Sequence, residues 1–190
     1  MPTETFDLTE PELTADDLLV LDDPHFGGDT VAVVTGAASG IGQATAVALA
    51  ANGLTVVGAD VDEAGLEETV ELAADVDAPG EVHPIRTDLT DDADVEAMIE
   101  GAAELGELRY VANVAGMQHI ASIPEFPMEK YDLLLDVMLR APFLVAKLAM
   151  PHIRATDDGV GAIANMASVH GHYATKDKPA YITAKHGLQG

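Results

Sequence analysis

Tyr181 and Lys185 are the residues whose types and spacing point most directly to chemistry. Being four residues apart on a predicted helix, they place their side chains on one face, one turn apart. An ammonium group beside a phenol favours the tyrosinate form, which can take the proton of a substrate hydroxyl near neutral pH. Ser168 carries a hydroxyl that can hold the substrate oxygen. An isolated Tyr–Lys pair is more often an ordinary surface pair. Whether this pair is catalytic therefore depends on the elements around it.

A glycine-rich segment, Thr-Gly-Ala-Ala-Ser-Gly-Ile-Gly at 35–42, lies between a predicted strand and a predicted helix. Gly36 permits a tight turn, Gly40 lets the backbone approach a pyrophosphate, and Gly42 allows the helix to pack closely on the strand. The helix N-terminus supplies amide groups and a positive dipole end. This pattern predicts a phosphate site, although glycine-rich turns without a ligand are also common.

Asp60 ends the next predicted strand, 18 residues beyond Gly42. A carboxylate there can accept hydrogen bonds from an adenosine ribose diol and repel a 2′-phosphate. No Lys or Arg follows closely to pair with that phosphate. The coincidence of strand, glycines, helix and acid therefore predicts a dinucleotide site that prefers NAD over NADP. The alternative for Asp60 alone is an ordinary acid at the end of a strand.

Short β-branched runs alternate with longer helical stretches, which predicts βαβ crossovers and a parallel sheet covered on both faces. The expected fold class is α/β, a doubly wound, Rossmann-like sheet flanked by helices. The predicted strands are 31–35, 54–59, 82–86, 108–113 and 161–167. The predicted helices are 41–52, 63–75, 91–105, 128–154 with an interruption or kink at Pro142, and one that begins near Pro179.

The N-terminal region differs in composition from the rest. Residues 1–28 are polar and acidic, which predicts an arm, and residues 29–190 form the predicted NAD-binding domain. No Lys or Arg occurs before Arg86, whereas 18 carboxylates do. Secretory and transit peptides need an N-terminal positive charge, so the cytoplasm is the expected location.

The overall composition excludes several classes of function. The chain has 9 Lys+Arg against 33 Asp+Glu, a formal charge of −24 that repels nucleic-acid backbones. The uncharged stretch 31–59 is divided by polar residues and glycines, so no membrane helix is expected. The chain contains no Cys, and no metal site is expected, because no metal-like cluster with acids is formed by His25, His83, His152, His172 or His186.

Taken in order, these residues resemble the motifs of the short-chain dehydrogenase/reductase family over residues 30–190. Besides the glycine segment and Tyr-x-x-x-Lys, the sequence has Asp88-Leu89 after the third predicted strand and Asn-Val-Ala-Gly at 113–116. The resemblance implies a nicotinamide-dependent oxidoreductase, usually a homo-oligomer and often a tetramer, that acts on a small molecule. It implies that the catalytic residues are Ser168, Tyr181 and Lys185, and that NAD is held by Gly36, Ser39, Gly40, Ile41, Gly42, Asp60, Asp88, Leu89, Asn113, Ala115, Gly116, Tyr181 and Lys185.

Five further segments resemble those of the branch of the family that oxidises 3-hydroxybutyrate to acetoacetate. They are residues 115–119, 126–130, 167–171, 178–181 and 184–187. By that resemblance Gln118, His170 and Lys178 hold the substrate carboxylate. The chemistry suits a short anion, because Lys178 supplies charge while the other two donate hydrogen bonds. The alternatives are another alcohol or ketone substrate within the same family, and a surface Lys beside a loop His.

Two features depart from the family pattern. Met138 stands where the family usually has an Asn that completes a proton relay with the Lys, and a thioether cannot conduct a proton. The chain also ends five residues after Lys185, whereas family members continue, so we expect the last strands to be missing. A truncated NAD-binding module without turnover is therefore a third reading.

The excess of carboxylates predicts a protein that works in concentrated salt. Asp outnumbers Glu, 19 to 14, and only 5 Lys are present. Salt screens the repulsion between these charges. We expect the midpoint of thermal unfolding, followed by circular dichroism, to rise as KCl increases to molar concentration. A midpoint that stays constant or falls would identify an ordinary acidic protein instead.

Overall fold

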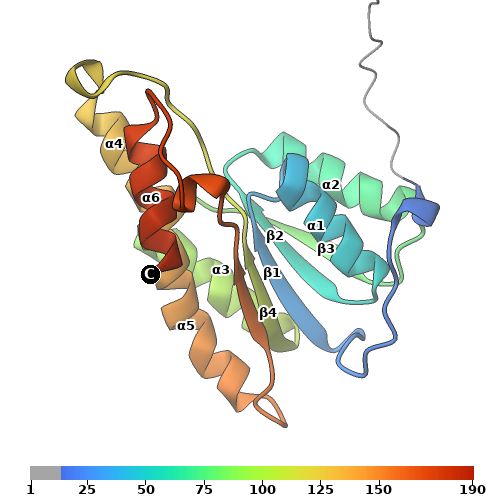
Figure 1. The fold of residues 1–190 in the computed structure, drawn as a ribbon. Coiled ribbons are helices and arrows are strands. Elements are labelled where there is room, and N and C mark those ends of the chain that lie inside the picture. Colours follow the sequence, from blue (N-terminus) through green and yellow to red (C-terminus); the bar gives the residue numbers. More distant parts are fainter. Residues whose placement is uncertain (1–13) are drawn as a thin grey trace, which may run out of the picture.

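A computed structural model describes residues 14–190, which form a five-stranded sheet between two layers of helices (Figure 1). All pairings are parallel, and the strand order is β3-β2-β1-β4-β5. This arrangement confirms the expected doubly wound α/β fold. The strands are β1 (Thr30–Thr35), β2 (Thr55–Asp60), β3 (Glu81–Arg86), β4 (Glu107–Asn113) and β5 (Ala162–Asn165).

Three of the helices, α2, α3 and α6, begin at a side-chain cap or at a proline in the first position. Asp62 accepts a hydrogen bond from the amide of Gly65 before α2, and Asp91 accepts one from Ala93 before α3. Pro179 occupies the first position of α6, where its missing N–H costs nothing. The helices are α1 (Gly40–Ala51), α2 (Glu63–Asp75), α3 (Asp92–Leu105), α4 (Met128–Leu135), α5 (Ala141–Ala155) and α6 (Pro179–Gln189). Within residues 14–190 we find no helix with the length and apolar character needed to cross a membrane.

The core lies on both faces of β1. Val31 and Val33 pack with α3 and α5 on one face, whereas Ala32 and Val34 pack with α1 and α2 on the other. These four residues are fully buried, as expected for a central parallel strand. The chain leaves β1 toward β2 and returns on the opposite side at β4. The carboxyl ends of β1 and β4 therefore border the crevice in which open α/β sheets bind their ligands.

The predicted helix 128–154 is corrected by the structure. It is three consecutive segments, α4, a π-helical segment (Asp136–Arg140) and α5, and the irregularity precedes Pro142. Pro142 follows this segment closely, and the backbone is helical from α4 into α5, so the carbonyl of Met138, four residues before the proline, has no N–H at Pro142 to pair with. The π-helical segment contains the buried Met138.

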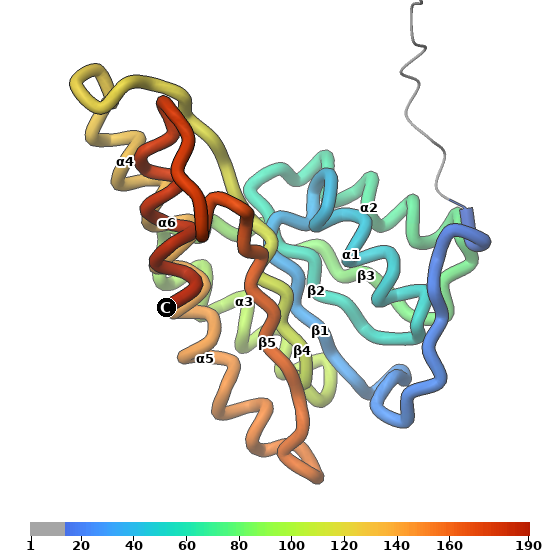
Figure 2. The backbone as a smooth tube through the Cα atoms, viewed as in Figure 1, coloured from blue at the N-terminus to red at the C-terminus, as the bar shows by residue number. Residues whose placement is uncertain are grey.

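The fifth strand is shorter than the predicted 161–167. β5 lies at the edge of the sheet beside β4 (Figure 2). Its last pair in register is Asn113 with Asn165, because β4 ends there. The other predicted strand boundaries differ from the structure by about one residue, the usual uncertainty at element ends.

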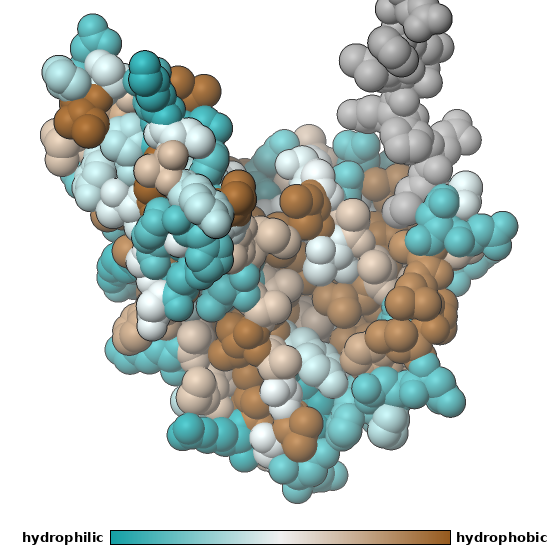
Figure 3. All heavy atoms as spheres, viewed as in Figure 1, coloured by the Kyte–Doolittle hydropathy of each residue, from teal (hydrophilic) through white to brown (hydrophobic). Residues whose placement is uncertain are grey.

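The described part of the arm, residues 14–28, is attached to the fold by side chains. The amide group of Asn52, at the end of α1, donates to the carbonyl of Leu19 (2.9 Å) and accepts from the N–H of Leu21 (2.7 Å). Phe26 packs edge-on against Tyr110 of β4, with ring centroids 5.7 Å apart. Exposed apolar side chains at 19–21 give this segment its apolar surface (Figure 3). The first 13 residues of the predicted arm lie outside the described residues, and its boundary at residue 28 stays a prediction.

An ionic cluster joins the arm to β4 and to the loop before β5. His25 lies between Asp158 (2.8 Å) and Asp23 (3.2 Å). The buried Arg109 of β4 contacts Glu107 and donates to Asp158 (2.6 Å). The hydrogen bond from His25 to Asp158 raises the pKa of the imidazole, and the bond to Asp23 adds to this effect. His25, expected to be structural or solvated, is thus a structural contact.

We expect His25→Gln to lower the free energy of unfolding most at mildly acidic pH. Because the pKa of His25 is raised in the folded chain, protonation stabilises the fold fully below the ordinary value of 6.5. That contribution is lost as the pH rises through the folded-state pKa. Urea unfolding of both chains at pH 6 and pH 9 measures it, with His152→Gln, on α5 outside the cluster, as the control. A difference independent of pH would show that the charge of His25 plays no part.

Candidate active site

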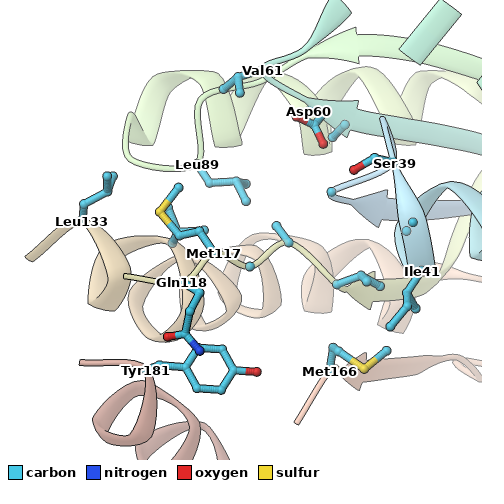
Figure 4. A pocket seen from close by; sticks show the side chains of 18 of the residues that line it. Ser39, Ile41, Asp60, Val61, Leu89, Met117, Gln118, Leu133, Met166 and Tyr181 are labelled. Carbon is cyan, nitrogen blue, oxygen red and sulfur yellow. The ribbon is translucent and has the colours of Figure 1, made fainter. Parts of the chain in front are cut away.

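A cavity of about 910 Å³ lies at the carboxyl ends of the strands (Figure 4). It is bordered by the β1–α1 turn, the ends of β2, β4 and β5, and the start of α6. Among the described residues, no group of three or more His, Cys, Asp or Glu is placed to hold a metal ion. The residues that line the cavity include every predicted site residue except Asn113.

The glycine turn is shaped by backbone contacts that leave no room for side chains. Gly36 has φ +73°, and a Cβ on it would lie 2.7 Å from the Cα of Ala115. A Cβ on Gly42 would lie 1.9 Å from the carbonyl oxygen of Gly36. α1 begins at Gly40, so its first amides face the cavity at the turn. This geometry suits a phosphate group at the N-terminus of a helix.

Asp60 lies at the same end of the cavity as Ser39 (Figure 4). Its carboxylate accepts hydrogen bonds from the amides of Ala38 (3.3 Å) and Asp62 (3.2 Å). The lysines among the described lining residues are Lys178 and Lys185, which come from the α6 region and not from the neighbourhood of Asp60. At the Asp60 end the described lining residues thus include no Lys or Arg, and Arg86, which is paired in register with Asp60 on β3, is not among them.

Asp88 and Leu89, which the resemblance assigns to NAD binding, follow β3 and line the cavity. The Asp88 carboxylate accepts hydrogen bonds from the hydroxyl (2.7 Å) and the amide (2.9 Å) of Thr90. The bond from the Thr90 hydroxyl is the main reason that the pKa of Asp88 lies below its ordinary value. Asp88 is therefore ionised at neutral pH, and one of its oxygens already has two donors.

The segment after β4 is held by a side chain of β1. The hydroxyl oxygen of Thr35 accepts hydrogen bonds from the amides of Val114 (3.1 Å) and Ala115 (3.3 Å), and Ala115 and Gly116 line the cavity. Asn113 does not line it; its amide donates to the side-chain oxygen of Asn165 (2.9 Å). Asn113 thus joins the ends of β4 and β5 and supports the site without lining the cavity.

Tyr181, Lys185 and Ser168 all line the cavity, and the Ser168 hydroxyl accepts a hydrogen bond from the amide of His170 (3.2 Å), whose ring contacts Tyr181. The Lys185 ammonium lies 5.7 Å from the centre of the Tyr181 ring and donates to the carbonyl of Met166 (2.6 Å). Lys185 is buried, and this burial lowers its pKa from the ordinary value of 10.5. The apolar residue Met166 gave no sequence signal, because its contribution is a main-chain oxygen.

The three residues expected to hold a carboxylate also line the cavity. Gln118 is on the loop after β4, and Lys178 directly precedes α6. His170 packs edge-on against the Tyr181 ring at 5.8 Å, and its buried Nδ1 has no partner among the described residues. The loops that carry Gln118 and Lys178 are joined by a hydrogen bond from the Ala121 amide to the Asp177 carbonyl (3.0 Å). These two loops therefore present their polar side chains to one space.

Met138 is a core residue beside this end of the site. It packs with Leu134, Ala180 and Ala184, and its sulfur would lie 3.4 Å from a Cβ placed on Gly116. Apolar lining residues that sequence reasoning did not single out are Val61, Val114, Met117, Leu133 and Val137. Apolar residues of these types usually belong to the hydrophobic core, so the sequence alone does not show that they line a cavity.

Comparisons with known proteins agree with this geometry. The family model for short chain dehydrogenases matches residues 30–190. The chain is 35% identical over 163 residues to a D-beta-hydroxybutyrate dehydrogenase of Cupriavidus necator, covering 84% of this chain and 60% of the relative. It is 37% identical over 162 residues to a cis-4-hydroxycyclohexanecarboxylate dehydrogenase of Sinomonas cyclohexanicum, covering 84% and 63%. The chain thus spans less than two thirds of the length of these relatives.

A solved structure of a metagenomic short-chain oxidoreductase in complex with NADP has a TM-score of 0.79 with this chain. The two are 31% identical, and the match covers 86% of this chain and 73% of the other. The family model, the relatives and the shared fold lead to one conclusion: the chain belongs to the short-chain dehydrogenase family.

Proposed function

We propose that this protein is an NAD-dependent oxidoreductase that interconverts a small hydroxy acid, 3-hydroxybutyrate, and its keto acid, acetoacetate. The observation that carries the proposal is a single cavity with the glycine turn and Asp60 at one end and Ser168, Tyr181 and Lys185 at the other. The first set suits a dinucleotide and the second suits proton transfer from an alcohol. When bound, the nicotinamide accepts or returns the hydride.

The proposed proton step uses the residues at the α6 end. Tyr181 takes the proton of the substrate hydroxyl, and Ser168 holds the substrate oxygen. The Lys185 ammonium, on the Tyr181 face of α6, stabilises the tyrosinate. Its donation to the Met166 carbonyl fixes the position of that charge. Because the buried Met138 offers no proton-conducting group, a proton that reaches this site must travel through water or another side chain.

Asp60 supports NAD as the cofactor. A carboxylate held by two amides can accept the ribose hydroxyls and repels a phosphate at the 2′ position. The solved relative is a complex with NADP, so the family also includes members that bind NADP.

The polar lining residues Gln118, His170 and Lys178 support a substrate that carries a carboxylate. Lys178 supplies a positive charge in a chain of formal charge −24, and Gln118 and His170 add donors. The unpartnered Nδ1 of His170 is a buried polar atom whose desolvation a ligand would offset. Other hydroxy acids share this chemistry, and the name of the Sinomonas relative includes one. The cytoplasmic location, the high-salt origin and the homo-oligomer stay predictions.

We expect NADH absorbance to appear when the folded chain receives NAD and D-3-hydroxybutyrate in molar KCl. Tyr181→Phe should reduce kcat by about 10²- to 10⁴-fold, because it removes the proton acceptor, and leave NAD binding within about twofold. Tyr173→Phe, at an exposed tyrosine outside the cavity, is the matched control. A folded chain that binds NAD without turnover would identify a cofactor-binding module. A chain that binds no dinucleotide would contradict the proposal altogether.

Lys178→Ala tests the substrate class separately. If Lys178 pairs with a carboxylate, KM for 3-hydroxybutyrate should rise about ten- to a hundredfold, since a hydrogen bond to a charged group contributes roughly 1.5–3 kcal/mol. The affinity for NAD should stay constant. Lys176→Ala, in the same loop but outside the cavity lining, controls for the loss of surface charge. An unchanged KM would assign another substrate to the site.

A further inference from the structure

The peptide group between Ala37 and Ala38, in the middle of the glycine turn, is held at both of its polar atoms. The Ala37 carbonyl accepts a hydrogen bond from the Thr69 hydroxyl of α2 (2.7 Å). The Ala38 amide of the same peptide group donates to the Asp60 carboxylate of β2 (3.3 Å). A rotation of this peptide plane would break both bonds together.

Thr69 is fully buried, so its hydroxyl has no water with which to replace these partners. It lies within bonding distance of the Ala37 carbonyl and of the Gly65 carbonyl (2.8 Å), and its single proton serves one of them at a time. Its oxygen accepts from the Gln43 side chain of α1 (3.2 Å), which also approaches the Ala38 carbonyl (3.4 Å). The turn is therefore connected to both α1 and α2.

Gly65 lets α2 come close enough for this contact. A Cβ at Gly65 would lie 2.5 Å from the carbonyl oxygen of Ala38 and 2.8 Å from its Cβ, so any larger residue must push α2 away from the turn. Gly65 and Thr69 are one helical turn apart and share the face of α2 that touches the turn. Neither residue lines the cavity.

We propose that Thr69 is a positioning residue for dinucleotide recognition: its hydroxyl fixes the Ala37–Ala38 peptide, and through the Ala38 amide it orients the Asp60 carboxylate. This inference rests on the proposed function, since it assigns Asp60 to the adenosine ribose. The other Asp60 oxygen is bound by the Asp62 amide, so the Ala38 amide is what sets the rotation of the carboxylate about that anchor. A residue outside the cavity thereby controls the selectivity for NAD over NADP.

Thr69→Val tests the proposal, because it keeps the shape of the side chain and removes the hydroxyl. We expect the dissociation constant for NAD to rise about fivefold to tenfold, while that for NADP changes less than about twofold. The ratio of the NADP constant to the NAD constant therefore falls. Thr69→Ser, which keeps the hydroxyl, should restore the parent ratio. Thr156→Val, which removes a hydroxyl bonded to the Ile153 carbonyl at the end of α5, should leave both constants unchanged. Isothermal titration calorimetry measures both dissociation constants for the parent chain and the three variants.

A second measurement needs no cofactor. Amide hydrogen exchange of the free protein, followed by NMR, should show faster exchange at Ala38 in Thr69→Val, with the β2 amide of Val57 unchanged. If the parent binds no dinucleotide, the proposed function fails, and the exchange rate at Ala38 still decides whether Thr69 holds the peptide. If Thr69→Val keeps the parent ratio of constants and the parent exchange rate, Thr69 only fills space and the proposal is wrong.

Discussion

The contact between the β1–α1 turn and the end of β4 is the constraint on which the rest of the site depends. The backbone of Gly36 approaches Ala115 so closely that no side chain fits between them, and Gly42 approaches Gly36 even more closely. The hydroxyl of Thr35 then holds the amides of Val114 and Ala115. The strand order reverses between β1 and β4, so this contact forms the floor of the cavity. The positions of the two ends of the cavity depend on that floor.

Helix packing extends that floor to the two ends of the site. α2 touches the turn through Gly65 and Thr69, which brings the Asp60 end into place. At the other end α6 packs on α4 and on the π-helical segment, with Ala180 and Ala184 fully buried. Those two alanines flank Tyr181 and Lys185 on the same helix, so burial of one face of α6 directs the other toward the cavity. Small residues on the buried face allow this close approach, which explains why the core here contains alanine.

Most of the fold and of the candidate site could be predicted because local patterns carry them. β-Branched runs identify the buried strands, and the glycines from 36 to 42 identify the turn through backbone sterics. The position of Asn113 behind the cavity and the contact of Lys185 with the Met166 carbonyl could not be predicted. The position of Asn113 depends on the pairing of β4 with β5, and the contact of Lys185 depends on a main-chain atom. Neither can be recognised from residue types along the sequence. The irregularity beside Pro142 was predicted, but its π-helical form was not, because the sequence does not distinguish such a segment from an ordinary kink.

The charge of the chain and the chemistry of the cavity are linked. A protein of formal charge −24 repels an anionic dinucleotide and an anionic acid at long range. Of the 9 basic residues, Lys178 and Lys185 line the cavity, whereas Arg109 and Arg140 are engaged by acids elsewhere. Molar salt reduces the screening length to about 3 Å, which removes the long-range repulsion and spares contacts at hydrogen-bond distance. In concentrated salt the few local positive groups, and not the net charge, therefore decide which anions the cavity binds.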